Sequence, residues 1–142
     1  MRTLKPSLMP NLSLDDHFKD LFENTSDLIH FLSIDGNIEL VNPAWLTTLD
    51  YELHEVVDRN IYDFIHVPCI EEYKAARQEA ISKKSKVDLV TTFMTKHGKE
   101  VVGEGQIDCA YNMNQPLYTR CVFKNITARK IAEKNLRIVK SD

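Results

Sequence analysis

The sequence predicts an α+β domain: a five-stranded antiparallel sheet with helices packed on one face and a flanking helix at each end. Two observations favour this class. The chain has 142 residues, 43% of them hydrophobic and 27% charged, which is typical of one soluble globular domain. Its patterns run in the order hairpin, short helices and three further strands, an order that suits an antiparallel sheet covered by helices.

We divide the chain into a tail over residues 1–13, a domain over 14–126 that includes the N-terminal flanking helix, and a C-terminal helix over 127–142. The tail has two prolines and little periodicity. The flanking helix is predicted by apolar residues that recur on one helical face, namely Leu14, Phe18, Leu21 and Phe22. The polar run Asn-Thr-Ser at 24–26 is expected to end it.

A β-hairpin is predicted next. The apolar runs 28–34 and 38–41 flank Asp35-Gly36. Asp-Gly is favoured in two-residue hairpin turns because both central residues there take positive φ.

Residues 43–83 have helical patterns. Pro43 suits a first helical turn, and two further short turns follow in LHEVV and NIYDFI, the second capped by Asn60. A longer helix is expected from about 69 to 83, opened by Pro68. Its apolar side holds Ile70, Tyr73, Ala76, Ala80 and Ile81.

Three strands are predicted over 86–96, 100–111 and 117–126, with a turn at residues 96–99. The pair Gly103-x-Gly105 falls inside the second of these strands. It has no third glycine, so it is not a phosphate-binding loop.

The last helix is expected from Thr127, its N-cap, to Lys140. Ala128, Ile131, Asn135 and Ile138 are spaced as at a and d positions of a heptad, which predicts a short coiled-coil seam. An amphipathic cap on the domain's own sheet is the alternative. In either case, the basic outer face of this helix is expected to be solvated.

Charge and cysteine content exclude several function classes. The net charge is −3, so we expect no nucleic acid and no membrane as partner. Three cysteines without a Cys-x-x-Cys pair indicate reduced thiols in the cytoplasm. No apolar run approaches the roughly 20 residues of a membrane span.

Four segments in order resemble the PAS domains of bacterial signalling proteins. They are Ile34–Trp45, Leu49–Asn60, Lys96–Lys99 and Asn125–Leu136, and the resemblance covers about residues 18–137. Asp50 and Asp58 stand where the family often has glycine, and His97 stands where its turn usually has aspartate. The His-Pro-Asp-Asp that often precedes the long helix reads His66-Val67-Pro68-Cys69 here.

The resemblance implies a cytosolic sensor or dimerisation module rather than a catalyst. Such a module forms a homodimer and passes ligand or packing changes through its C-terminal helix to an effector domain of the same longer chain, such as a histidine kinase or diguanylate cyclase. A ligand-free scaffold that only mediates protein contact is the alternative.

Candidate residues follow from this resemblance and from the patterns above. Near the pocket between sheet and helices we place Trp45, Leu49, Ile61, Phe64, Tyr73, Phe93, Cys109, Cys121 and Phe123. These side chains could surround a small ligand or could simply fill the core. For dimer contacts and output we name Leu14, Phe18, Phe22, Asn125, Ile131, Asn135 and Ile138.

We expect no catalytic residue and no metal site. We also expect none of three cofactors found in the family: flavin, haem and a covalently bound chromophore. The stretch 59–64 lacks the cysteine of light-sensing flavin domains. The long helix lacks a histidine for haem, with Tyr73 its one oxygen donor, and His30 in the first strand is expected to be a hydrogen-bonded structural residue. Cys69 resembles a chromophore-bearing cysteine in position, but Val41 and Trp45 stand where the supporting Tyr and Glu would be. The ligand itself stays unknown.

Overall fold

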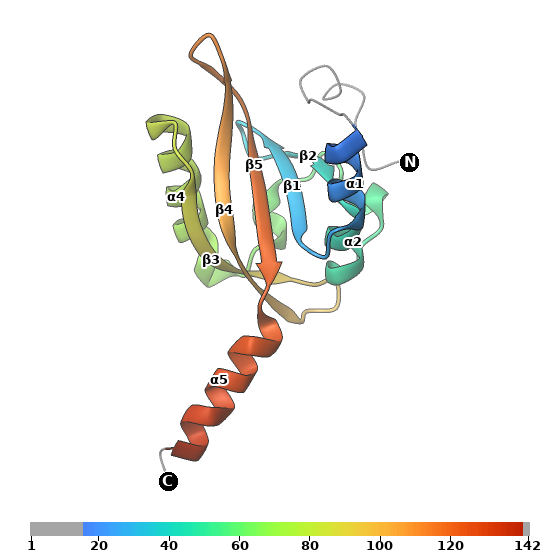
Figure 1. The fold of residues 1–142 in the computed structure, drawn as a ribbon, viewed down its shortest axis with the longest axis vertical. Coiled ribbons are helices and arrows are strands. Elements are labelled where there is room, and N and C mark those ends of the chain that lie inside the picture. The colour runs from blue at the N-terminus through green and yellow to red at the C-terminus, as the bar shows by residue number, and fades with distance from the viewer. Residues whose placement is uncertain (1–15, 141–142) are drawn as a thin grey trace.

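One antiparallel sheet contains all five strands: β1 (Leu28–Ser33), β2 (Ile38–Val41), β3 (Val87–Met94), β4 (Glu100–Asn112) and β5 (Gln115–Asn125). The strand order is β2-β1-β5-β4-β3, so the first and last strands of the chain are neighbours (Figure 1). The computed structural model describes residues 16–140, and side chains as far as Ile138. Leu14 therefore lies outside the described residues. The predicted α+β class and five-stranded sheet are confirmed.

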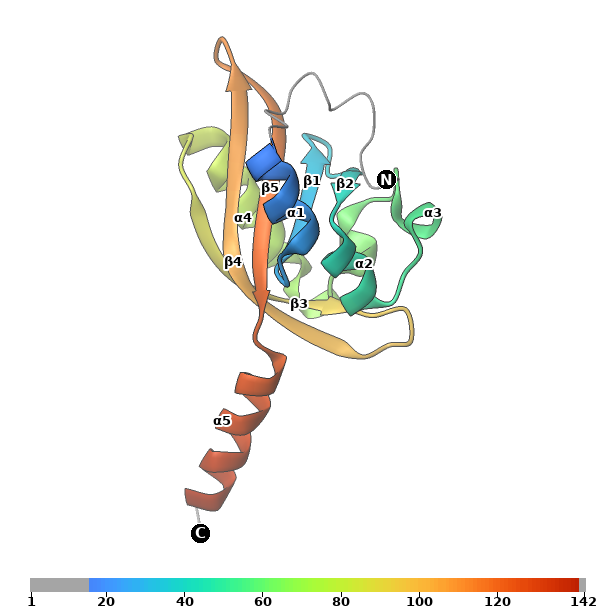
Figure 2. The ribbon, with the colours of Figure 1, turned by 45° about the vertical axis from the view of Figure 1, so that its right-hand side comes forward.

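Helices cover the two faces of the sheet unequally. On the inner face lie α2 (Pro43–Leu49), α3 (Leu53–Val56), the 3-10 turns η2 (Ile61–Phe64) and η3 (Val67–Cys69), and α4 (Ile70–Lys83). The short helix α1 (Asp16–Asn24) lies on the opposite, outer face, in front of the sheet in Figure 2 with α4 behind it. Because strand side chains alternate between faces, each face has its own apolar cluster.

The hairpin between β1 and β2 is confirmed, but its turn differs from the prediction. Only Gly36 has positive φ, at 92°, and its N–H donates to the Ser33 carbonyl at 2.8 Å. The turn therefore needs a left-handed residue at one position rather than at both. The register also shifts between Phe31 and Leu32, which a regular two-residue hairpin would not require.

Local caps fix the short helices. Asn42 accepts a hydrogen bond from the Trp45 N–H at the start of α2, and Asn60 accepts one from the Tyr62 N–H at η2. Asp50 and Asp58, which replace glycines common in the family, both have φ of 67°. Aspartate is among the few non-glycine residues that adopt this left-handed conformation readily, so the fold keeps both bends.

The glycines of β4 allow close packing. A Cβ on Gly105 would lie 1.9 Å from the Val122 carbonyl oxygen, and one on Gly103 would lie 3.0 Å from the Phe93 ring. Both residues pair with β5 within the sheet, as predicted for a strand.

The C-terminal helix α5 (Thr127–Lys140) has the predicted bounds. It continues from β5 and points away from the sheet instead of folding back over it (Figure 1). The alternative of a cap on the domain's own sheet is therefore wrong for this structure.

Candidate functional site

A buried polar chain crosses the core between the sheet and α4. The Trp45 Nε1–H donates to His30 Nδ1 at 3.1 Å, His30 Nε2 lies 2.7 Å from Tyr73 Oη, and Tyr73 Oη lies 3.3 Å from Cys121 Sγ. All four residues are fully buried. They come from α2, β1, α4 and β5, so these hydrogen bonds link two helices to two strands of the sheet.

The direction of these hydrogen bonds follows from the indole. An indole N–H can only donate, so His30 Nδ1 is the acceptor and the proton of the neutral ring is on Nε2. Nε2–H then donates to Tyr73 Oη, which leaves the tyrosine hydroxyl free to donate to Cys121 Sγ.

Burial keeps the titratable side chains of this hydrogen-bonded group uncharged. Burial, and to a lesser extent the positive charge of Arg77, lowers the pKa of His30 from 6.5 to about 3. Burial raises the pKa of Tyr73 well above its usual value and raises the pKa of Cys121 to about 12. At pH 7 all three groups are therefore neutral, and His30 has hydrogen-bond partners at both ring nitrogens, as expected.

Eight of the nine predicted pocket residues meet in this core. Trp45, Leu49, Ile61, Phe64, Tyr73, Phe93, Cys121 and Phe123 are at most 2% exposed and belong to one apolar cluster. Four aromatic rings surround His30 at centroid separations of 6.0–6.4 Å. Cys109 lies apart from them, half-buried beside Ala110, so the structure does not bring it into the cluster.

Arg77 on α4 was missed by the sequence reasoning. Its side chain is 6% exposed, and its Nη2 donates to the Ser33 and Ile34 carbonyls at 2.9 and 3.2 Å. Nη2 also lies 3.4 Å from Thr119 Oγ1, while the Arg77 Nε–H has no acceptor among the described residues. Arg77 thus ties α4 to the end of β1. Only its place on the apolar side of the helix, between Ala76 and Ala80, could have indicated this.

The junction between the sheet and α5 is a compact set of hydrogen bonds. Asn125 Oδ1 accepts from the Thr127 N–H at 3.0 Å and from the Thr127 hydroxyl at 2.6 Å. The same hydroxyl accepts from the Val102 N–H at 2.9 Å, and Arg129 pairs with Glu104 at 3.2 Å. Thr127 was predicted as the N-cap, but Asn125 caps the first turn and Thr127 holds it to β4.

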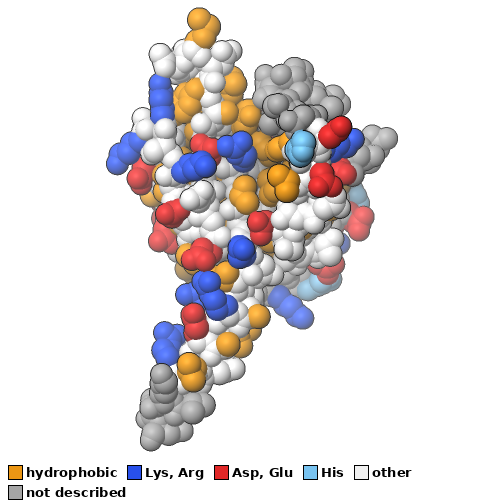
Figure 3. All heavy atoms as spheres, viewed as in Figure 1, with side chains coloured by type: hydrophobic (Ala, Val, Ile, Leu, Met, Phe, Trp, Pro, Cys, Tyr) orange, Lys and Arg blue, Asp and Glu red, His pale blue; other side chains and the backbone are white. Residues whose placement is uncertain are grey.

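The predicted seam of α5 faces solvent. Ile131 and Ile138 are 56% and 57% exposed, and Asn135 is also exposed. Hydrophobic side chains follow one side of the helix in Figure 3. At its base, Val102 and Ile131 line a hollow of about 210 Å³.

The predicted contacts on α1 pack within the chain. Phe18 and Phe22 lie against Phe31 of β1, with ring centroids 6.3 and 6.4 Å away. Phe22 is only 2% exposed. Their role in a dimer stays a prediction.

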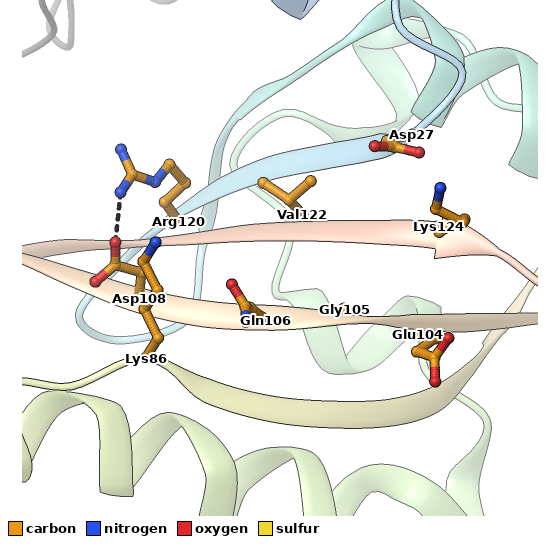
Figure 4. Close-up of a pocket in the computed structure, with 9 residues that line it drawn as sticks. All are labelled: Asp27, Lys86, Glu104, Gly105, Gln106, Asp108, Arg120, Val122 and Lys124. Carbon is orange, nitrogen blue, oxygen red and sulfur yellow. Dashed lines mark hydrogen bonds and ion pairs between the residues drawn. The ribbon is translucent and has the colours of Figure 1, made fainter.

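A charged hollow lies on the outer face of the sheet (Figure 4). It has a volume of about 280 Å³ and is lined by Asp27, Lys86, Glu104, Gly105, Gln106, Asp108, Arg120, Val122 and Lys124. Arg120 forms an ion pair with Asp108 across β5 and β4. Three cations and three carboxylates line it, so the hollow has no excess of one sign.

Comparison with known proteins decides the family. A family model described as the PAS fold matches residues 16–126, which is most of the chain. This chain belongs to the PAS family. The PAS domain of a protein from Colwellia psychrerythraea has a TM-score of 0.72 at 17% identity, over 79% of this chain and 96% of that one. A sensory box histidine kinase/response regulator from Burkholderia thailandensis E264 has a TM-score of 0.70 at 19% identity, over 89% and 96%.

One curated relative also matches this PAS domain. The white collar 2 protein of Neurospora crassa is 29% identical over 127 residues, which cover 84% of this chain. The chain spans about a quarter of that relative, 24% of its length. PAS domains thus occur in signalling proteins that include sensor histidine kinases, and this chain has their fold.

The described part of this PAS domain has neither a metal-binding cluster nor a helix that could span a membrane. Among residues 16–140 no group of three or more His, Cys, Asp or Glu side chains is placed to hold a metal ion. In the same range no helix is long and apolar enough to cross a membrane.

Proposed function

We propose that this PAS domain is a cytoplasmic, homodimeric sensor module that relays packing changes in its core to an effector domain through α5. A histidine kinase or diguanylate cyclase of the same longer chain is the effector we propose. In this proposal the 142 residues of this chain have no catalytic role. The observation that carries it is α5: an amphipathic helix that leaves the sheet with Ile131 and Ile138 more than half exposed.

The exposed face of α5 supports pairing with a second helix. Ile131 and Ile138 are seven residues apart, so they lie on the same stripe, and Asn135 lies beside them. Burying each isoleucine fully against a partner would stabilise the dimer by roughly 1.5–3 kcal/mol, because it removes apolar surface from water. An isolated helix of this length is marginal in water, so a partner would also stabilise it.

The junction at Asn125 supports the relay. Cys121 and Phe123 of β5 pack in the core, and the same strand leads into the cap of α5. Thr127 couples that cap to β4 through the Val102 N–H. A change in core packing that moves β5 against β4 would therefore favour one arrangement of the α5 pair over another, which is a population shift.

A scaffold without a ligand is the second candidate, and the filled core favours it. Each of the eight buried pocket residues is at most 2% exposed. Native mass spectrometry of protein purified without added ligands, with an absorbance spectrum from about 300 to 700 nm, separates the two candidates. Extra mass lost on denaturation supports a ligand sensor, whereas a bare dimer without absorbance supports the scaffold.

Charged residues introduced into the seam test whether two α5 helices pair. Ile131→Asp combined with Ile138→Asp buries carboxylates in the proposed interface and should convert the dimer to monomer in sedimentation analysis. Leu136→Asp is the matched control, because Leu136 is equally exposed at 55% but lies off the stripe. A dimer that survives the double substitution would remove α5 from the interface.

A further inference from the structure

Strand β3 forms one edge of the sheet, with β4 on one side and no strand on the other. In Figure 4 it is the yellow-green strand at the border of the sheet, next to β4. A linker closes only its C-terminal half: the His66 N–H donates to the Thr92 carbonyl at 2.8 Å, and Ile65 forms an isolated bridge with Phe93. Over residues 87–91 no described residue pairs with the backbone on this side.

The unpaired backbone groups of this edge belong to Asp88 and Val90. In an antiparallel strand both backbone groups of a residue point to the same side, and neighbouring residues alternate. The Thr92 carbonyl points outward to His66, so the N–H and C=O groups of Asp88 and Val90 point outward as well. Those of Leu89 point to β4 instead. Two donors and two acceptors are thus available to an added strand.

A hollow on the outer face of the sheet lies beside this edge. It has a volume of about 490 Å³ and is lined by Asp88, Leu89, Val90, Glu104, Gly105 and Gln106. Val90 is 44% exposed and provides an apolar wall. Asp88 accepts from the Gln106 amide at 3.0 Å but pairs with no cation in the part of the chain that the structure describes, whereas Glu104 already pairs with Arg129. The hollow is therefore acidic, and its unpaired carboxylate lies next to the unpaired backbone.

We infer that the open half of β3 is a docking site for an extended segment of a partner protein, which adds to the sheet as an antiparallel strand. The segment carries a lysine or arginine opposite Val90. Directly opposed residues share a face and diagonal neighbours are within reach of long side chains. The aliphatic stem of the cation therefore covers Val90, and its charged head reaches Asp88. Backbone hydrogen bonds supply the affinity, and the acidic hollow selects the basic residue.

A synthetic peptide tests the site. The probe is acetyl-Thr-Val-Thr-Lys-Thr-Val-Thr-amide, and the comparison peptide has glutamate in place of lysine. Titrating the lysine peptide into the isotope-labelled chain should shift the NMR signals of the Asp88 and Val90 amides most and slow their hydrogen exchange. The glutamate peptide should bind at least about tenfold more weakly. The inference is overturned if the lysine peptide does not bind, or if the shifts fall on β2, the other edge strand.

Two substitutions separate the backbone from the charge. Val90→Pro removes an N–H that points away from β4, a position at which edge strands tolerate proline, and should weaken lysine-peptide binding at least about tenfold. Asp88→Lys keeps every backbone group and should reverse the preference toward the glutamate peptide. Asp20→Lys on α1, across the sheet, is the matched charge reversal and should change neither affinity.

Thermal unfolding shows whether each variant keeps its fold. If Val90→Pro unfolds early, Asp88→Lys decides the test, because a side chain on the exposed face can change without loss of a backbone hydrogen bond. Wild-type affinity for the lysine peptide in a folded Asp88→Lys variant would rule out the acidic hollow as its binding site. The site is separate from α5, so these results do not depend on whether the module is a dimer.

Discussion

His30 shows at the scale of one residue how an imidazole becomes a neutral core group. Trp45 occupies its Nδ1 and Tyr73 its Nε2, so no partner remains that could stabilise a second proton. Arg77 adds a positive charge nearby, which opposes protonation further. The ring therefore behaves as a polar spacer that joins three elements.

This environment predicts a pH-dependent stability. Below pH 6.5 the unfolded chain binds a proton at His30, whereas the folded chain binds it only near the lowered pKa of about 3. The free energy of unfolding should therefore fall as the pH drops from 6.5 toward 3, by about 1.4 kcal/mol for each pH unit. Urea unfolding at pH 6.5 and 5 should show a loss of about 2 kcal/mol from this group.

His30→Gln is the matched variant, because an amide can still accept from Trp45 and donate to Tyr73 but does not titrate. It should remove this part of the pH dependence. An identical loss of stability in both proteins between these pH values would contradict the assignment. His30→Ala should cost about 2–5 kcal/mol at every pH, since it leaves a cavity and unsatisfied polar groups.

Arg77 gives a second prediction at this scale. Its planar guanidinium reaches the Ser33 and Ile34 carbonyls with one nitrogen and approaches Tyr62 with the other. A lysine ammonium cannot match this fork, so Arg77→Lys should destabilise the domain by about 1–3 kcal/mol in urea unfolding. Lys74→Arg on the exposed side of the same helix should change stability by less than about 0.5 kcal/mol. Equal effects of the two exchanges would argue against the tie to β1.

Residue types predicted the core better than its polar contacts. Large apolar residues on periodic patterns fall in the core almost by necessity, and eight of nine pocket candidates do so. The Trp45–His30–Tyr73–Cys121 chain depends on how α2, β1, α4 and β5 meet, which no local pattern contains. Cys109 misled the prediction because it has the correct parity on β4 but lies toward the end of the hairpin.

At the scale of elements, Thr127 decides how firmly α5 is attached to the sheet. Thr127→Val removes the hydroxyl that accepts from the Val102 N–H and donates to Asn125. It should cost about 1–3 kcal/mol, because a part-buried N–H loses its partner. Hydrogen exchange should quicken at the Val102 amide and through the first turn of α5.

Thr127→Ser keeps the hydroxyl and should preserve that protection. If the valine and serine variants exchange alike, the junction is held by packing alone and the proposed coupling between β4 and α5 loses its support.

Helices and strands were predictable because their periodicities are local. The strands differ from their predicted bounds by two residues or fewer at each end, and α5 matches at both ends. The turn at Gly36 and the cap at Asn125 were assigned differently because several local conformations satisfy the same residues. Which one forms depends on contacts with η2 and β4, far away in the sequence.

At the scale of the whole molecule, charge is balanced in composition but ordered in space. From the net charge of −3 we expected no nucleic acid and no membrane as partner, yet the register gathers carboxylates on β4 and cations on β5. Figure 3 shows both signs over these strands with hydrophobic side chains between them. Composition averages over this order, so only the strand pairing reveals it.

Ionic strength tests which forces hold the proposed dimer. Salt shortens the Debye length from about 10 Å at 0.1 M to about 3 Å at 1 M, which weakens exposed charge pairs but not apolar contacts. Pairing through Ile131 and Ile138 of α5 is apolar, so the dissociation constant of the dimer should stay the same or fall between about 0.1 and 1 M NaCl. Ile131→Asp combined with Ile138→Asp should be monomeric at both salt concentrations. A dimer whose dissociation constant rises steeply with salt would instead be held by exposed charges rather than by α5.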